Sequence, residues 1–211
     1  MQLVKRAFDI LFALCLLSLL WPVLAVCAVL VRLSSPGPIL YLGLRTGLHG
    51  VPFRIFKFRS MRTDAEQTGG TTTGQNDPRI TPIGHVLRKY KLDELPQLFN
   101  VIRGDMSFVG PRPEVAEYTN AYTPEERQIL SVQPGITDLA CLEFTDLQEH
   151  VGEDDPDSAY RERILPLKNA LRLKYAREQS LWLDVSIMAR TAAVVLSKPF
   201  RGRTHGNRRA A

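Results

Sequence analysis

The chain has 211 residues, 45% hydrophobic and 23% charged, a composition that excludes wholesale disorder and predicts one globular domain with at most one appendage. Its net charge of +5 equals the five Lys and Arg residues of segment 197–211, which contains no acid. A basic end on a neutral body argues against a nucleic-acid partner and predicts a disordered or lipid-facing tail. Three cysteines, two of them in one apolar stretch, form neither a disulfide framework nor a zinc site and indicate a reducing compartment.

The first element is an apolar run from Ile10 to Val31, 22 positions without a charged residue. A helix of roughly 20 such residues crosses a hydrocarbon core of ~30 Å. The run is longer than the core of a secretory signal, which has about 7–15 residues. A lipoprotein cleavage site is disfavoured because Val26, before Cys27, is larger than the residue such sites carry. The run therefore predicts a helix inserted in the membrane.

Pro22 lies in the middle of this run. It lacks a backbone N–H and its ring opposes the carbonyl of Ser18, so a kink is expected there. Lys5 and Arg6 precede the run and Arg32 follows it, and the positive-inside tendency would keep both ends in the cytoplasm. A straight span must export one end, whereas a re-entrant, hairpin-like insertion exports neither. The residues alone leave both arrangements open.

Beyond the loop at 34–38, strands are expected at 39–42 and 53–58, joined by a turn at 47–50 into an antiparallel hairpin. The polar segment 63–78, with its glycine-rich centre at 69–74, predicts a mobile loop. Thr81 followed by Pro82 predicts the start of a helix that runs to about residue 95.

The second half of the chain predicts further helices, a rigid loop at 110–113 and a turn at Pro134-Gly135. The helices are expected at 114–122, 124–132, part of 158–173 and 181–196, the last of them amphipathic and suited to a membrane interface. Together these elements indicate an α+β fold. Its expected parts are a membrane helix at 1–33, a compact domain at 34–197 and the basic tail at 198–211.

The densest cluster of reactive residues is segment 78–113, which carries the adjacent carboxylates Asp93 and Glu94. One carboxylate can attack or take a proton while the other holds a hard divalent cation. The surrounding cations, with carboxylates and no other obvious nucleophile, are typical of phosphate chemistry. They are Lys57, Arg59, Arg88 and Arg112. For an isolated Asp-Glu pair, the alternative is a solvated helix face neutralised by neighbouring Arg and Lys residues.

Many separate motifs occur here in one order, from Lys5 to about Leu196, and they resemble those of the bacterial sugar transferases, the monotopic phosphoglycosyl transferases. The motifs are Lys5-Arg6-x-x-Asp9, Ser35-Pro36-Gly37-Pro38, Arg45-x-Gly47, Phe56-Lys57-Phe58-Arg59-Ser60-Met61, Asp77-Pro78-Arg79-Ile80-Thr81, Leu92-Asp93-Glu94-Leu95-Pro96-Gln97-Leu98, Gly104-Asp105-Met106-Ser107, Gly110-Pro111-Arg112-Pro113 and Pro134-Gly135-Ile136-Thr137.

The resemblance implies transfer of a sugar phosphate from a nucleotide diphosphate sugar, usually a UDP-sugar, to a polyprenyl phosphate such as undecaprenyl phosphate. Asp93 matches the nucleophile of the family and Glu94 the residue that binds Mg2+. The basic positions around the diphosphate match Lys57, Arg88 and Arg112, and we add Arg59 and Arg45 from neighbouring motifs.

The resemblance also implies a re-entrant helix with both ends cytoplasmic, which places the domain on the cytoplasmic face of the bacterial inner membrane among its lipids. A homodimer is left open. Two departures stand out: Trp21 replaces the serine of the family's kink, and Asp138-Leu139-Ala140-Cys141 replaces a common Gly-Trp-Ala-Gln. A non-catalytic, membrane-anchored module that binds lipid or a partner remains the alternative, although a binder of anionic lipid gains nothing from two acids among its cations.

Overall fold

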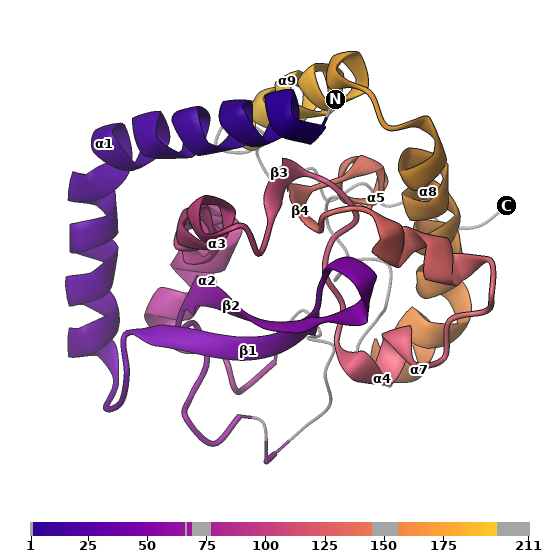
Figure 1. Cartoon of the computed structure of the whole chain (residues 1–211). Helices are drawn as coiled ribbons and strands as arrows, with labels where there is room; N and C mark the ends of the chain where they lie inside the picture. Colours follow the sequence, from indigo (N-terminus) through magenta and orange to yellow (C-terminus); the bar gives the residue numbers. More distant parts are fainter. Residues whose placement is uncertain (1, 66, 69–76, 145–155, 198–211) are drawn as a thin grey trace, which may run out of the picture.

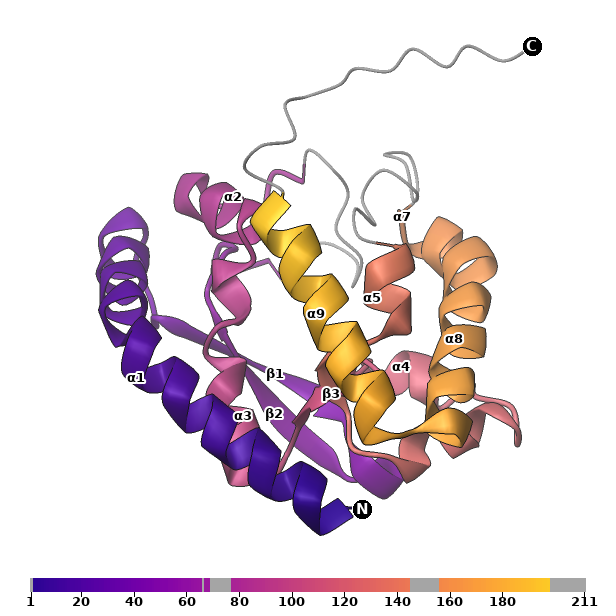
Figure 2. The same cartoon turned by 90° about the horizontal axis from the view of Figure 1, so that it is seen from above.

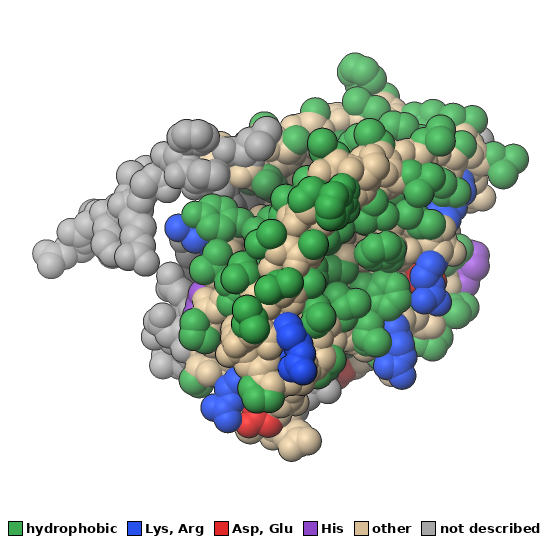
Figure 3. Space-filling view, turned by 90° about the vertical axis from the view of Figure 1, so that its left-hand side faces the viewer, with side chains coloured by type: hydrophobic (Ala, Val, Ile, Leu, Met, Phe, Trp, Pro, Cys, Tyr) green, Lys and Arg blue, Asp and Glu red, His purple; other side chains and the backbone are tan. Residues whose placement is uncertain are grey.

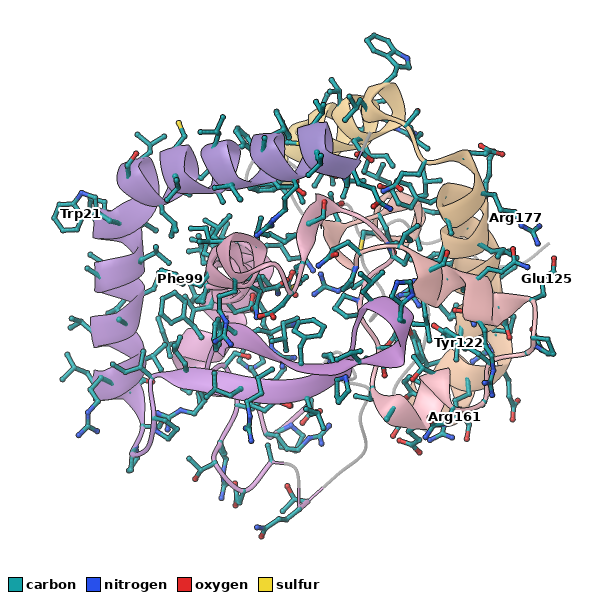
Figure 4. The ribbon with its side chains drawn as sticks, viewed as in Figure 1. Trp21, Phe99, Tyr122, Glu125, Arg161 and Arg177 are labelled. Atoms are coloured by element: carbon teal, nitrogen blue, oxygen red, sulfur yellow. The ribbon has the colours of Figure 1, made fainter. Side chains whose placement is uncertain are left out.

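The protein is described from a computed structural model over residues 2–65, 67–68, 77–144 and 156–197. It begins with α1 (Gln2–Ser34), which among the described residues is the helix long and apolar enough to cross a membrane. Figure 1 shows α1 changing direction near its middle, and Figure 4 places Trp21 on the outer side of this bend. Pro22 lies inside the helix, and its missing N–H accounts for a bend there.

The predicted antiparallel hairpin is confirmed. Strands β1 (Leu40–Thr46) and β2 (Pro52–Phe58) pair along their whole lengths, and a 3₁₀ turn, Leu48–Gly50, joins them. β1 is longer than predicted, because residues past 42 keep pairing with β2 although their side chains do not alternate in hydrophobicity. The hairpin forms one side of the molecule, opposite the N-terminal half of α1 (Figure 1).

The predicted start of the next helix is confirmed: in α2 (Pro82–Lys89) the Thr81 hydroxyl accepts a hydrogen bond from the N–H of Gly84 at 3.0 Å. The predicted extension to residue 95 is wrong. Lys91 adopts the left-handed conformation, with φ of 58°, and this ends the helix. A 3₁₀ turn, η2 (Leu92–Glu94), follows, and after Pro96 the chain enters α3 (Gln97–Arg103).

A small parallel pair, β3 (Ser107–Val109) and β4 (Gly135–Thr137), was not predicted. The expected turn at Pro134-Gly135 instead leads directly into β4. The helices expected at 114–122 and 124–132 shrink to α4 (Ala116–Thr119) and a 3₁₀ helix, Glu126–Ser131. Each of these segments is too short to carry a hydrophobic period of its own.

The C-terminal helices complete the fold. They are α5 (Leu139–Glu143), α7 (Pro156–Ala159), which continues through a π-helical turn at Tyr160–Ile164 into α8 (Leu165–Glu178), and α9 (Leu181–Ser197). The helix predicted at 181–196 is therefore confirmed. The glycine-rich centre, 69–74, of the loop predicted at 63–78 and the tail at 198–211 lie outside the described residues.

Both halves of α1 pack against the same body. Ala13, in its first half, joins the main core with residues of β2, α3, β3, α8 and α9. Cys27 and Val31, in its second half, join a smaller core with Phe58 and Leu87. Figures 1 and 2 show α9 beside the N-terminal half of α1, and together they cover the end of the molecule above the strands.

Candidate active site

The adjacent carboxylates Asp93 and Glu94 lie on the 3₁₀ turn η2, between α2 and α3. The left-handed Lys91 sets the chain direction before the turn, and Pro96 begins the next helical segment after it. The helical segment is thus interrupted before and after the turn, and the two acids lie where the chain changes direction between α2 and α3. The sequence predicts that they lie near the end of one long helix, and that prediction is wrong.

Glu94 is held by two cations from distant segments. Lys57 Nζ, from β2, lies 3.1 Å from Glu94 Oε1, and the Arg112 guanidinium, from the loop after β3, contacts the same oxygen. All three side chains are largely buried. The structure therefore brings together three of the predicted site residues, and burial from water strengthens their attraction.

Asp93 has different surroundings. It is only 6% exposed, and its Oδ1 has no hydrogen-bond partner among the described residues. Burial, together with the neighbouring Glu94 charge, raises the pKa of Asp93 against the opposing pull of Lys57 and Arg88. Burial would also raise the pKa of Glu94, but Arg112 and Lys57 outweigh it and hold that pKa well below its ordinary value. Glu94 is therefore paired with cations, whereas Asp93 has an oxygen without a partner in the part of the chain that the structure describes.

Arg88, in the last turn of α2, is the third cation of the cluster. Its Nε donates to the Ser60 hydroxyl at 2.8 Å, which fixes the guanidinium plane. Burial lowers the pKa of Arg88 while Asp93 and Asp77 oppose that shift by raising it. Arg88 therefore lies within electrostatic reach of Asp93, as predicted.

Two other predicted cations lie elsewhere. Arg59 is buried and donates to the carbonyl oxygens of Ser35 and Pro36, both at 2.7 Å, so it fastens the loop after α1. Arg45 donates to a neighbouring backbone carbonyl at 2.7 Å. Along the hairpin it lies four residue pairs from the pair that contains Lys57, ~13 Å for a strand rise of about 3.4 Å. Contact of Arg59 and Arg45 with a substrate stays a prediction.

The loop that carries Arg112 is fixed by its backbone. The N–H of Gly110 donates to the carbonyl of Thr137 at 3.1 Å, and the N–H of Gly135 donates to that of Pro111 at 3.1 Å. A Cβ on Gly110 would lie 2.1 Å from the carbonyl oxygen of Gln133, so only glycine allows this approach. The parallel strand pair thus positions the loop beside η2.

Sequence reasoning missed three residues around this cluster. Ser60 orients Arg88, Asp138 accepts from the backbone N–H of Arg112 at 2.9 Å, and Arg172 donates to Asp138 at 3.2 Å. Asp138 had one available signal, because an Asp before a helical segment is a frequent N-cap. No comparable sequence signal marks Arg172, since it lies in the middle of a helix among other charged residues.

The donor set fits a magnesium ion bound together with a substrate. No group of three or more metal-ligating side chains occurs among residues 2–65, 67–68, 77–144 and 156–197. Magnesium is commonly held by one or two carboxylates plus substrate phosphates and water, and the carboxylate of Glu94 is a hard oxygen ligand of that kind. A buried carboxylate near Lys57 and Arg88, next to a Glu94 that Arg112 contacts, can attack an anionic phosphorus that these cations screen.

The sequence comparisons agree with this chemistry. A model of the family described as "Bacterial sugar transferase" matches residues 1–198. The UDP-glucose:undecaprenyl-phosphate glucose-1-phosphate transferase of Escherichia coli K12 is 39% identical, over 89% of this chain and 39% of its own length. The protein of the same name from Caulobacter vibrioides is 37% identical, over 92% of this chain and 70% of its own length.

A third relative is similar in size. The exopolysaccharide production protein PSS of Rhizobium leguminosarum bv. phaseoli is 38% identical, over 92% of this chain and 96% of its own length. The chain thus spans well under half of the E. coli relative but nearly all of the Rhizobium one. Because the family match covers nearly the whole chain, including the turn with the two carboxylates, the chain belongs to the bacterial sugar transferase family.

Proposed function

We propose that this chain transfers a sugar 1-phosphate from a nucleotide diphosphate sugar, most simply a UDP-sugar, to a polyprenyl phosphate such as undecaprenyl phosphate. The products are a polyprenyl-diphosphate-linked sugar and a nucleoside monophosphate. This reaction would start the assembly of a surface polysaccharide or glycoconjugate. Relatives named for glucose-1-phosphate transfer to undecaprenyl phosphate support the reaction class.

The observation that carries the proposal is the buried Oδ1 of Asp93, which has no partner among the described residues and lies near Lys57 and Arg88, while Arg112 contacts the adjacent Glu94. A buried polar atom without a partner costs about 1–3 kcal/mol, so it is typically retained where a ligand completes it. Cations around a carboxylate favour an anionic ligand, and a diphosphate ester has that charge.

In the first step, a carboxylate oxygen of Asp93 attacks the phosphorus that bears the sugar. The bond from that phosphorus to the bridging oxygen breaks, and the nucleoside monophosphate leaves with the electron pair. Arg88, Lys57 and Arg112 screen the approach of one anion to another and stabilise the charge on the leaving group. Magnesium, held by Glu94, would supply further charge neutralisation.

In the second step, an oxygen of the lipid phosphate attacks the same phosphorus and expels the Asp93 carboxylate. Neither step requires a proton transfer when Asp93 and the lipid phosphate react in their anionic forms. Splitting the transfer lets one carboxylate serve both substrates in turn. The enzyme is thus expected to follow ping-pong kinetics.

The membrane arrangement proposed here is re-entrant insertion of α1 from the cytoplasmic face of the bacterial inner membrane. At the start of α1, Lys5 Nζ lies 2.6 Å from Asp184 of α9, and Arg6 donates to the carbonyl of Ile102 at 2.8 Å. Near its end, Val31 is fully buried against the same body. Contacts of both ends of α1 with one domain support an insertion that leaves the two ends on the same side of the bilayer.

The surface properties support the same arrangement. Figure 3 looks onto the face that carries α1, where hydrophobic side chains cover most of the surface and Lys and Arg side chains lie toward its edges. Leu11 and Trp21 of α1 are 68% and 64% exposed, and Trp182 of α9 is 81% exposed. Exposed apolar side chains on neighbouring helices suit burial in lipid, with α9 lying in the interface.

The test is nucleotide release from a panel of UDP-sugars in detergent or nanodiscs, with undecaprenyl phosphate and Mg2+. We expect nucleotide release from at least one donor, and multiple turnovers should require the lipid. Donor and Mg2+ without lipid should add the mass of one phosphosugar to the protein, and double-reciprocal plots should be parallel. Intersecting plots with no adduct would indicate direct attack by the lipid phosphate in a ternary complex. Absence of release from every donor would favour the non-catalytic membrane module instead.

A further inference from the structure

A chain of alternating charges connects the candidate active site to helix α8. Glu94 contacts Arg112, the backbone N–H of Arg112 donates to Asp138 Oδ2 at 2.9 Å, and Arg172 Nε donates to that same oxygen at 3.2 Å. Arg172 also donates to Glu114 Oε1 at 2.9 Å. Four segments distant in the sequence are thereby joined through buried polar groups.

The central pair of this chain is sealed from water. Asp138 is 0% exposed and Arg172 is 1% exposed. Two buried opposite charges compensate one another, and loss of one partner leaves the other as a buried, uncompensated charge. Asp138 is also occupied at its second oxygen, because Oδ1 accepts from the N–H of Cys141 at 2.5 Å and caps α5. The Asp138 carboxylate therefore has little freedom to reorient.

Arg112 is held at its backbone and at its side chain. Its N–H is fixed by Asp138, and its Nη1 donates to the carbonyl of Ile136 at 2.9 Å, which leaves Nη2 directed at Glu94. The close approach at Gly110 restrains the same loop from the other side. The guanidinium thus reaches Glu94 from a nearly rigid support.

We propose that Asp138 and Arg172 are positioning residues, which fix the Arg112 loop so that the Arg112 guanidinium meets both Glu94 and the diphosphate of the donor. The inference rests on the proposed function, because the diphosphate is the ligand that Arg112 would meet.

The variant that tests it is Arg172→Met, which keeps the length of the side chain and removes its charge. Arg172→Lys keeps the charge but cannot donate to two carboxylates with the geometry of a guanidinium. The matched control is Arg177→Met on the same helix. Arg177 forms an exposed pair with Glu125 at 2.7 Å, and Figure 4 shows both on the outward side of α8.

The measurement compares the two half-reactions. In ping-pong kinetics, kcat/KM for the donor reports the first step and kcat/KM for undecaprenyl phosphate reports the second. With the best UDP-sugar of the panel, Arg172→Met should lower kcat/KM for the donor at least ~10-fold more than kcat/KM for the lipid, because only the first step has a nucleoside monophosphate to expel. Product inhibition by UMP should weaken in parallel.

Arg172→Lys should give an intermediate value, and Arg177→Met should match the wild type. A loss of folded enzyme would lower both kcat/KM values by one factor and leave UMP inhibition unchanged, and that result would overturn the positioning role. If Arg172→Met yields no folded protein, the Lys variant alone decides between the same two outcomes. A wild type that releases no nucleotide from any donor contradicts the proposed function itself, whereas an active wild type with equal losses contradicts only this inference.

Discussion

Asp93 and Glu94 are neighbours in the chain, yet their carboxylates have opposite surroundings. Glu94 Oε1 lies 3.1 Å from Lys57 Nζ and contacts the Arg112 guanidinium, whereas Asp93 Oδ1 is buried without a partner among the described residues. The 3₁₀ turn separates the two side chains, and the cations reach only one of them directly. This asymmetry supports the different tasks that we propose for the two acids.

Asp93→Asn should abolish transfer. The change keeps the shape of the side chain and removes its negative charge, so a covalent route would be lost and the rate should fall at least ~10³-fold. Nucleotide release and the mass of the phosphosugar adduct measure the effect. Asp64→Asn, in an exposed pair with Arg62 at 3.0 Å, is the control and should stay at wild-type rate. An Asp93→Asn enzyme with a tenth of normal activity would refute the nucleophile assignment.

The same Asp93→Asn change should raise thermal stability at neutral pH in the absence of Mg2+. Burial raises the pKa of Asp93 in the folded protein, so the folded state binds its proton more tightly than the unfolded state does. Stability contributed by this group is therefore lost as pH rises from the ordinary Asp pKa through the raised one. The Tm difference between variant and wild type should be small near pH 4 and larger at pH 7. A variant that is less stable at pH 7 contradicts this electrostatic account.

Chelation should stop the reaction. With excess EDTA, turnover by the wild type should fall to background, and added Mg2+ should restore it, since one or two carboxylates with substrate phosphates form a typical Mg2+ site. Mn2+ binding in the presence of UDP, monitored by electron paramagnetic resonance, gives a readout that is independent of activity. Glu94→Gln should weaken that binding at least ~10-fold. Full turnover in EDTA would assign Glu94 a role without metal.

Both ends of the chain should be cytoplasmic. On a background lacking Cys15, Cys27 and Cys141, a cysteine at position 2 or 205 should resist a membrane-impermeant maleimide in intact cells and react after lysis. The buried Lys5–Asp184 pair ties the start of α1 to the domain, which is the structural reason for position 2. Labelling of position 2 from the periplasm would establish a straight span.

The two tryptophans should report different depths in lipid. Trp21 lies at the bend of α1, where a re-entrant helix would be deepest, and Trp182 lies on α9, which we propose lies in the membrane interface. In single-tryptophan variants, Trp182→Phe and Trp21→Phe, deep brominated lipids should quench Trp21 more strongly, and shallow ones should quench Trp182. Equal quenching of both by shallow lipids would indicate that α1 lies flat on the surface.

The sequence alone determined the elements whose signal is local. The charge-free run predicted α1, and the Thr81-Pro82 pair predicted the start of α2. The strand-like segments 39–42 and 53–58, joined by the 47–50 turn, predicted the hairpin. Each of these patterns depends on residues close in the chain. The mixture of acids and cations in segment 78–113 also indicated phosphate chemistry before any geometry was available. These signals need no knowledge of how distant segments meet.

Only the tertiary structure decided which cations meet which acids. Lys57 and Glu94 are 37 residues apart, and Arg172 and Asp138 are 34 apart, so no local period encodes either pairing. The same holds for the contact of Arg59 with Pro36 in the loop after α1, which joins residues 23 apart in the chain. Such contacts arise because burial of the core brings the segments together, after which buried charges must find partners.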